Sequence, residues 1–270
     1  TPVADLNRSN DFAYLEQVAA AYAILEVSPF KNVSLNAGLR VENTSSLGEL
    51  TSIVATDDDL VARNYTSLFP NVSASYNDQQ NHAFSLSFGR RITRPNYQDM
   101  NPFESPISEL SSWKGNPFLR PNYITNYQLT YSFKRKLVVS NTYSITKAFF
   151  ANIFTTTDEK SNILTPRNMQ RVTNNGLSVS YPLKVTSWWQ FSAFAIYNYS
   201  TYDGDIEGTV IDLTGHIFNG RLQNNFKLPL GITMELSYYG SSPWIWRGTI
   251  NVEPYHSVAL GIRKSFFDER

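Results

Sequence analysis

The sequence predicts an all-β fold in which about eleven strands follow one another in antiparallel, up-and-down order. Three observations lead to this prediction. Apolar and polar residues alternate with a period of two along most of the chain, which is the spacing of side chains along a strand. The connections between these strands are alternately short and long. The helical period of about 3.6 residues does not emerge anywhere in the sequence.

Composition narrows the class of protein further. The 270 residues carry a formal net charge of +0, with 17% charged and 14% aromatic residues. The charged fraction lies below the roughly 25% of soluble domains. The longest apolar run, Val18–Leu25, is too short for a membrane-spanning helix, which needs about 20 residues. A neutral chain without a basic run argues against nucleic-acid binding, and the absence of cysteine excludes disulfides and a thiol nucleophile.

The clearest strand covers residues 33–42, in which every second residue is apolar: Val33, Leu35, Ala37, Leu39 and Val41. Four further segments alternate as clearly: 84–91, 126–133, 232–239 and 257–263. Weaker alternation predicts six more strands: 11–27, 67–76, 137–154, 169–181, 188–202 and 214–228. In the first of these, the apolar face is predicted to run through Phe12, Tyr14, Val18, Tyr22 and Ile24.

The connections carry the second signal. Short ones are predicted at 28–32, 77–81, 134–136, 182–187 and 229–231. Long ones are predicted at 47–66, 94–122, 155–168, 203–213 and 240–254. Tight turns on one rim and long loops on the other are typical of transmembrane β-barrels. A Greek-key sandwich has no reason to keep this alternation.

The apolar face is predicted to meet lipid. The strands are about ten residues or longer, which is the length that crosses a bilayer when tilted. Aromatic residues gather near the short turns and near the long loops, where they suit the headgroup layer. The two groups are Phe133, Trp188, Trp189, Phe266 and Phe267, and Tyr197, Tyr199 and Tyr238. The other face is rich in Ser, Thr, Asn, Gln, Gly, Arg and Glu, which suits a hydrated interior.

Hydrocarbon offers no partner to backbone polar groups, so a spanning sheet must close on itself. Single-chain bacterial barrels have an even number of strands, and about eleven does not fit that rule. The sequence begins at Thr1 without an initiator Met and ends just after a strand-like run. We therefore expect residues 1–270 to be one segment of a larger barrel.

A specific series of motifs lies between the two clearest central strands. It consists of residues 87–97 with Arg94-Pro95, residues 100–103 with Asn101-Pro102-Phe103, and the Gly-Asn-Pro-Phe-Leu-Arg-Pro run at 115–121. Together with the flanking segments 38–44, 126–131 and 260–266, this series resembles outer-membrane β-barrel proteins of Bacteroidetes-type bacteria in the TonB-dependent receptor superfamily.

The resemblance implies a location in the bacterial outer membrane and a complete barrel of about 22 strands around an N-terminal plug domain. The plug and the closing strands would lie outside residues 1–270. The implied partners are outer-membrane lipid, the plug of the same protein, a TonB-type energy-coupling protein reached through the missing N-terminal part, and a surface lipoprotein. The prediction includes no cofactor, no catalytic residue and no nucleic acid.

Five charged residues fall on the polar face: Arg40, Glu42, Arg91, Glu235 and Arg263. They are candidates for a charged pore wall that steers a solute or holds the plug. The alternative is that neighbouring charges on this face simply pair with one another.

Four aromatic residues fall in the predicted long loops: Tyr97, Trp113, Trp244 and Trp246. They are candidates for stacking on an extracellular ligand such as a glycan or a siderophore. Alternatively, they pack the loops together or anchor in the headgroup layer. Asp57, Asp58 and Asp59 could bind calcium, although a solvated loop tip explains them as well. The histidines at 82, 216 and 256 share no metal or triad spacing.

The sequence thus predicts part of a receptor or transporter that takes up a scarce or large solute. A non-transporting barrel with a structural or adhesive role is the second hypothesis. An outer-membrane enzyme is the third, and it lacks support because no Ser–His or Asp–His pair can be assigned from the sequence.

Overall fold

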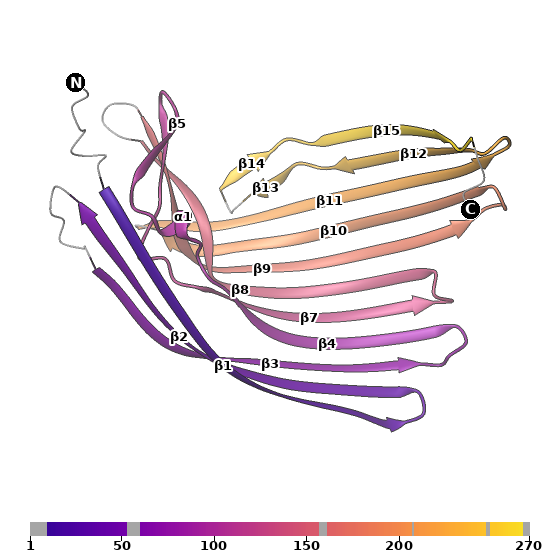
Figure 1. Cartoon of the computed structure of the whole chain (residues 1–270), viewed down its shortest axis with the longest axis horizontal. Coiled ribbons are helices and arrows are strands. Elements are labelled where there is room, and N and C mark those ends of the chain that lie inside the picture. The colour runs from indigo at the N-terminus through magenta and orange to yellow at the C-terminus, as the bar shows by residue number, and fades with distance from the viewer. Residues whose placement is uncertain (1–9, 53–59, 157–160, 207, 247–248, 267–270) are drawn as a thin grey trace.

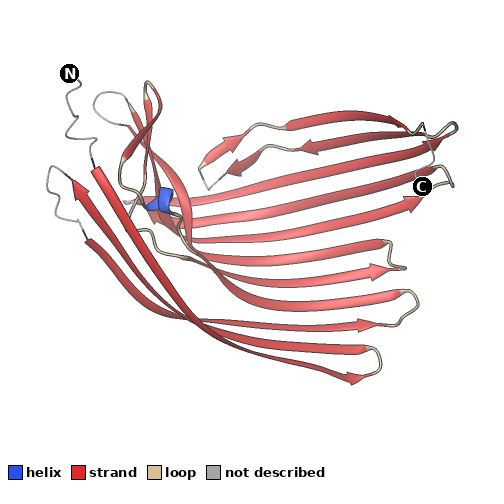
Figure 2. Ribbon diagram, viewed as in Figure 1, coloured by secondary structure: helices blue, strands red, loops and turns tan. Residues whose placement is uncertain are grey.

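The computed structural model describes residues 10–52, 60–156, 161–206, 208–246 and 249–266. Eleven strands form one antiparallel meander in chain order, which confirms the predicted strand count. Figures 1 and 2 show this sheet bent into an open trough. The strands are β1 (Asn10–Phe30), β2 (Val33–Ser52), β3 (Leu60–Asn77), β4 (His82–Thr93), β7 (Asn122–Phe133), β8 (Leu137–Thr156), β9 (Asn162–Lys184), β10 (Trp189–Ile206), β11 (Thr209–Leu228), β12 (Ile232–Ser241) and β15 (Tyr255–Lys264).

Two connections contain structure of their own. The connection between β4 and β7 holds a single helical turn, α1 (Tyr97–Met100), and the hairpin of β5 (Glu104–Ser108) and β6 (Ser111–Lys114). β6 also pairs in parallel with the start of β9. The connection between β12 and β15 holds the hairpin of β13 (Trp244–Trp246) and β14 (Ile250–Val252). Both connections lie near the same end of the sheet (Figure 1).

The register separates an apolar face from a polar face. Directly opposed residues of neighbouring strands share a face. One row across β2, β3, β4 and β7 is Leu35, Ala74, Leu86 and Leu129. The adjacent row is Ser34, Ser75, Ser85 and Thr130. Leu86 is 58% exposed and Leu129 52% exposed, so the apolar face is not the centre of a water-soluble core. It is the face that a membrane barrel presents to lipid.

The predicted facing of β1 is wrong. Its register places Tyr22 opposite Arg40 and Tyr14 opposite Gly48, which lie on the polar face. Leu25 and Val27 lie on the apolar face instead, opposite Ala37 and Leu35. The true outward row of β1 contains several small alanines, whereas large apolar side chains such as Tyr22 lie on the inward row. The sequence pattern alone therefore does not distinguish the two faces. Pairing with β2 decides between them.

Three predicted long loops are mostly strand. β2 and β3 stay paired to Glu49 and Leu60, β8 and β9 to Thr156 and Asn162, and β10 and β11 to Ile206 and Thr209. The ladder satisfies backbone polar groups in water as well as in lipid, so the hairpins continue beyond the apolar span. The connections predicted at 94–122 and 240–254 are long, as expected.

The short turns are closed by local hydrogen bonds. Asp78 Oδ1 accepts from the backbone N–H groups of Gln80, Asn81 and His82 at 2.8, 2.8 and 2.9 Å. The bond from the His82 backbone N–H is the main reason that the pKa of Asp78 lies below its usual value. Leu230 and Gly231 take positive φ angles of 64° and 71° in another short turn.

Aromatic contacts mark both rims of the apolar face. Near the short turns the Trp189 ring stacks on Phe226 at 6.0 Å. Each of the three histidines hydrogen-bonds a tyrosine hydroxyl through Nδ1: His82 with Tyr131, His216 with Tyr197, and His256 with Tyr238. These pairs give the polar ends of the rings a partner in the interfacial layer, a role that sequence spacing did not reveal. Among the described residues, no helix has the length and hydropathy needed to cross a membrane.

Candidate functional site

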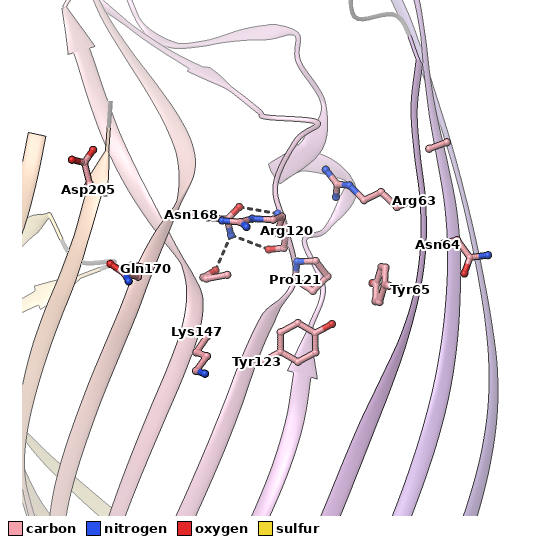
Figure 3. A pocket seen from close by; sticks show the side chains of 12 residues that line it. Arg63, Asn64, Tyr65, Arg120, Pro121, Tyr123, Lys147, Asn168, Gln170 and Asp205 are labelled. Atoms are coloured by element: carbon pink, nitrogen blue, oxygen red, sulfur yellow. Dashed lines mark hydrogen bonds between the residues drawn. The ribbon is translucent and has the colours of Figure 1, made fainter. Parts of the chain in front are cut away.

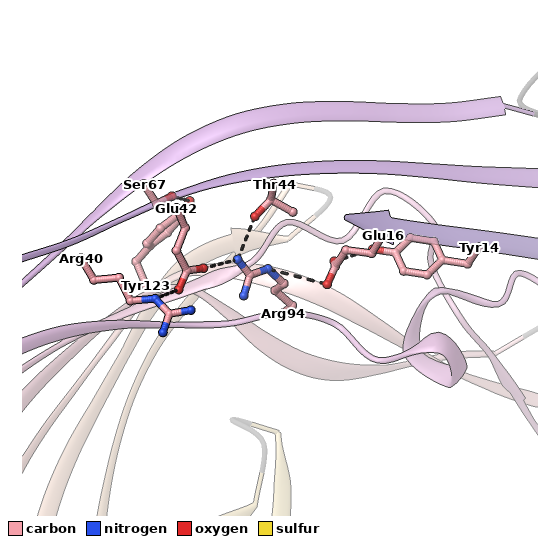
Figure 4. A network of polar contacts seen from close by, with 8 residues as sticks. All are labelled: Tyr14, Glu16, Arg40, Glu42, Thr44, Ser67, Arg94 and Tyr123. Atoms are coloured by element: carbon pink, nitrogen blue, oxygen red, sulfur yellow. Dashed lines mark hydrogen bonds and ion pairs between the residues drawn. The ribbon is translucent and has the colours of Figure 1, made fainter. Parts of the chain in front are cut away.

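An ion-pair network fixes the β4–β7 connection on the polar face of β1 and β2. Arg94 follows the last residue of β4, and its Nη2 lies 2.6 Å from Glu42 Oε2 and 2.8 Å from Thr44 Oγ1. Arg40 Nε lies 2.6 Å from the other oxygen of Glu42. Figure 4 shows Arg94 between Glu42 and Glu16, and its Nε is 3.9 Å from the latter. One arginine thus links the connection to two strands.

The centre of the network is shielded from water, whereas the Arg40 side chain is half exposed. Glu42 is only 6% exposed, and Thr44 is fully buried. Burial lowers the pKa of the Arg94 guanidinium, but the hydrogen bonds and charges of Glu42 and Tyr65 together outweigh burial, and the net pKa lies above the usual value. A buried carboxylate of this kind needs its cationic partners, because an unpaired charge in this position is costly.

Local sequence explains how the connection folds inward. Asn96 caps α1 by accepting from the backbone N–H of Asp99 at 2.8 Å. The Tyr97 hydroxyl donates to the Phe12 carbonyl at 2.9 Å, and the two rings lie 5.5 Å apart. Tyr97 therefore packs the connection against β1.

The Gly-Asn-Pro motif serves close packing. A Cβ at Gly115 would collide with the backbone of Asn101, so only glycine fits there. The Asn116 side chain donates to the Pro166 carbonyl of β9 at 3.2 Å. Arg63 of β3 donates to the carbonyls of Pro117, at 2.7 Å, and Leu119. The motif thus ties β3 and β9 to the same segment.

A cavity of about 880 Å³ lies beside this segment, between β3 and β7–β10 (Figure 3). Its charged and aromatic lining is Arg63, Tyr65, Arg120, Tyr123, Lys147 and Asp205. Three cations against one carboxylate make it an anion-attracting cavity, and the two phenol rings add apolar surface with a polar end.

A second cavity, of about 420 Å³, lies under β13 and has a different chemistry. Its polar lining contains no Lys, Arg, Asp or Glu and comes mainly from β9, β10 and β11: Asn174, Asn198, Ser200, His216 and Asn219. Trp244 and Trp246 of β13 complete it. Amides beside indole rings can bind a neutral polar ligand by hydrogen bonds and stacking.

An apolar cluster supports the second cavity. Ala151, Met169, Val172 and Tyr202 are buried together, and Ile245 of β13 packs on them. Gly204 allows this packing, because a Cβ there would come within 2.9 Å of Met169 Cγ. The β12–β15 connection is thus held by apolar contact, whereas the β4–β7 connection is held by charge.

The predicted pore-wall residues all lie on the polar face by register, and two of them form a close pair. Arg40 and Glu42 form the ion pair described above. Arg91 is on β4, Glu235 on β12 accepts from Gln223 Nε2 at 3.0 Å, and Arg263 is on β15. That these residues line a pore stays a prediction.

The predicted loop aromatics divide between the two connections. Trp113 lies on β6 and donates from Nε1 to the Gln98 carbonyl at 3.2 Å. Trp244 and Trp246 line one cavity together. Contact of any of the four with a ligand remains a prediction. Asp57, Asp58 and Asp59 lie outside the described residues, within which no group of three or more metal-ligating side chains comes together.

Sequence reasoning missed Arg63, Arg94, Arg120 and Lys147 as site residues. Arg94 and Arg120 belong to the motif series, which is the signal that marks them in the sequence. Arg63 falls in the connection predicted at 47–66, and Lys147 falls in the strand predicted at 137–154. Their association depends on contacts between strands distant in sequence.

Together, the curved meander, the exposed apolar face, the polar face and the folded-in connections define an outer-membrane β-barrel protein. The chain belongs to the Outer membrane protein beta-barrel family, whose model matches residues 1–270. This places it in the bacterial outer membrane, as predicted. The comparison with curated proteins gives no match.

Solved structures with a similar fold include a transporter and two receptors. The copper transporter OprC has a TM-score of 0.67 at 14% identity, over 92% of this chain and 41% of its own. The siderophore receptor PiuA from Acinetobacter baumannii has a TM-score of 0.65 at 12% identity, over 95% and 38%. The ferric yersiniabactin uptake receptor FyuA from Yersinia pestis has a TM-score of 0.63 at 12% identity, over 94% and 39%.

The chain therefore spans about two fifths of the length of these structures. They share its fold over nearly the whole chain, which confirms the predicted partial barrel. These three structures are named as a transporter and two receptors.

Proposed function

We propose that this chain forms barrel wall and outer loops of a receptor for energy-coupled uptake of a scarce or large solute. The observation that carries the proposal is the folded-in β4–β7 connection, fixed on the polar face by Arg94 and Glu42 at 2.6 Å. A loop held inside the sheet narrows the interior and places binding groups on the solute's path. A purely structural barrel has no need of it.

The similar structures support this proposal. One is a copper transporter, one is a siderophore receptor and one is a ferric yersiniabactin uptake receptor. In the complete protein, a plug domain would close the interior, a TonB-type protein would supply energy from the inner membrane, and a surface lipoprotein would assist capture at the outer rim. Pore-wall charges such as Arg91 and Glu235 would then face the solute or the plug.

The test uses the full-length protein in its own bacterium. Cells with and without its gene are offered candidate solutes in limiting amounts, and uptake is measured with the proton-motive force intact and collapsed. The proposal expects uptake that needs both the gene and the proton-motive force. Surface binding without any uptake would support the adhesive alternative and contradict the proposal.

A further inference from the structure

The wall of the sheet contains a seam between β3 and β4. β3 pairs with β2 from Tyr76 to Leu60, but with β4 only from Asn77 to Asn71. The pairing stops at Pro70, which has no N–H to donate. Beyond it, the β3 edge from Leu60 to Pro70 has no ladder partner on the β4 side among the residues that the structure describes, while β4 stays paired with β7 to its end. We call this edge and the space beside it the seam.

Side chains, not a backbone ladder, bridge the seam. Ser67 Oγ of β3 lies 2.8 Å from the Tyr123 hydroxyl of β7. Arg63 reaches the carbonyls of Pro117 and Leu119. A sheet edge in contact with lipid must have its polar groups satisfied by something other than hydrocarbon. The seam therefore favours a polar occupant.

The larger cavity lies within the wall at this seam. Four consecutive residues of β3 line it: Ala62, Arg63, Asn64 and Tyr65. Side chains of consecutive strand residues point to opposite faces. A cavity lined by all four must therefore lie at the edge of the strand rather than on one face. Figure 3 shows β3 on one side of this cavity and Arg120 and Tyr123 across from it.

The position along the strands places the cavity at the outer membrane interface. Tyr123 and Lys147 are opposed on the apolar face, two rows beyond Tyr127 and Tyr143, whose rings lie 6.4 Å apart. Lys147 is ten positions beyond Leu137, the first residue of β8. A tilted strand crosses the hydrocarbon in about 9–11 residues. Lys147 thus stands where headgroups begin.

The charges favour an anion. The cavity is lined by Arg63, Arg120 and Lys147, against the single carboxylate of Asp205. Asp205 Oδ1 already accepts from the Gly208 N–H at 2.9 Å. Among the described residues, no ion pair engages Arg120 or Lys147. Basic pockets at this level of a membrane protein suit anionic headgroups.

We propose that this cavity binds the anionic headgroup of an outer-leaflet lipid, a phosphate or carboxylate, which enters sideways through the seam. Lys147 and Arg120 contact the anion, and the acyl chains lie along the outward row that includes Tyr127 and Leu129. The lipid fills the gap that the missing β3–β4 ladder leaves. A soluble anion could satisfy the same charges, but it would not use the apolar face beneath them.

The test measures lipid retained by the full-length protein in nanodiscs. Mixed phosphatidylglycerol and phosphatidylcholine discs are used for the natural sequence, K147E, R120E and the double variant. Native mass spectrometry counts the lipids that stay bound after transfer to detergent. K134E, in the short turn at the opposite rim, is the matched control for the charge change. The heat-modifiable mobility of the barrel on gels confirms that each variant is folded.

We expect the natural sequence and K134E to retain phosphatidylglycerol in preference to phosphatidylcholine. The double variant should retain at least tenfold less phosphatidylglycerol than the natural sequence. Inorganic phosphate at millimolar concentration should not displace the lipid. Equal retention by the double variant overturns the proposal, as does absence of a preference for the anionic lipid. Displacement by inorganic phosphate would assign the cavity to a soluble anion instead, and would equally overturn it.

Discussion

Two connections fold onto the polar face near the same end of the sheet, and they are held by opposite means. The β4–β7 connection meets β1 and β2 through the Arg94–Glu42 ion pair. The β12–β15 connection meets β9–β11 through Ile245, which packs on the cluster of Met169 and Tyr202. The first contact depends on direction and charge, whereas the second depends on buried area.

The difference explains an irregularity in the alternation. Val172 and Tyr202 are apolar residues on the otherwise polar face, where water would be expected. They are buried because the β13 hairpin covers them. Around Arg94 the alternation is instead normal, and the polar residues of β2 are simply buried by the connection. A connection that folds onto the polar face thus gives apolar residues on that face in one case and normal alternation in the other.

The largest effect should come from the apolar cluster. Met169→Ala removes a fully buried side chain and should lower the free energy of unfolding by about 2–5 kcal/mol. Urea denaturation in lipid vesicles measures it, with M169L as the matched control that keeps the volume. The loss should be independent of salt. A loss below about 1 kcal/mol would show that the β13 hairpin is not held by this cluster.

The charged network should give the next effect. Arg94→Ala leaves Glu42 buried without one of its cations and should lower the free energy of unfolding by about 2–4 kcal/mol. This is somewhat less than the loss for a fully buried pair, because Arg94 keeps partial solvent access. Protease cleavage within residues 101–111 should increase as the connection loosens. In the double variant R94A/E42Q, much of the loss should be recovered. If E42Q added a further full loss, the two residues would not be coupled.

A substitution in a wall strand tests membrane insertion separately from the stability of the two connections. Leu236→Arg puts a charge on the apolar face and should cost about 2–4 kcal/mol near the bilayer midplane. Ser237→Arg, the next residue on the polar face, should be tolerated. Folding yield into vesicles compares the two. Equal yields would contradict the facing that underlies both connections.

The smallest effect should appear in a short turn, far from both connections. The pKa of Asp78 is lowered in the folded protein, so its stabilisation is complete above its unfolded pKa of about 3.9 and is lost as pH falls through the folded value. Amide exchange at Gln80–His82 should therefore accelerate in acid. D78N should exchange at a rate that hardly changes with pH over the same range. A pH response that survives in D78N would assign it to another group.

The repeating parts of the fold could be predicted because their cause is local. Each strand of the wall must place one face in lipid and one in water, so the polarity of residues such as Leu35 and Ser34 indicates which environment each side chain meets. The Gly-Asn-Pro motif likewise marked a tight segment, since only Gly115 fits against Asn101. The candidate site was less accessible. Arg40 and Glu42 were found from alternation, but their main partner, Arg94, lies about 50 positions away in the chain.

The sequence by itself determined that this is a lipid-facing antiparallel meander of eleven strands with uneven rims. Only the tertiary structure decided which face of β1 looks outward, where the β3–β4 ladder stops, and which side chains cover the polar face. The physical reason is range. Membrane solvation acts on each residue separately and leaves a period of two, whereas register, seam and cavity arise from pairing between distant segments, which no local pattern encodes.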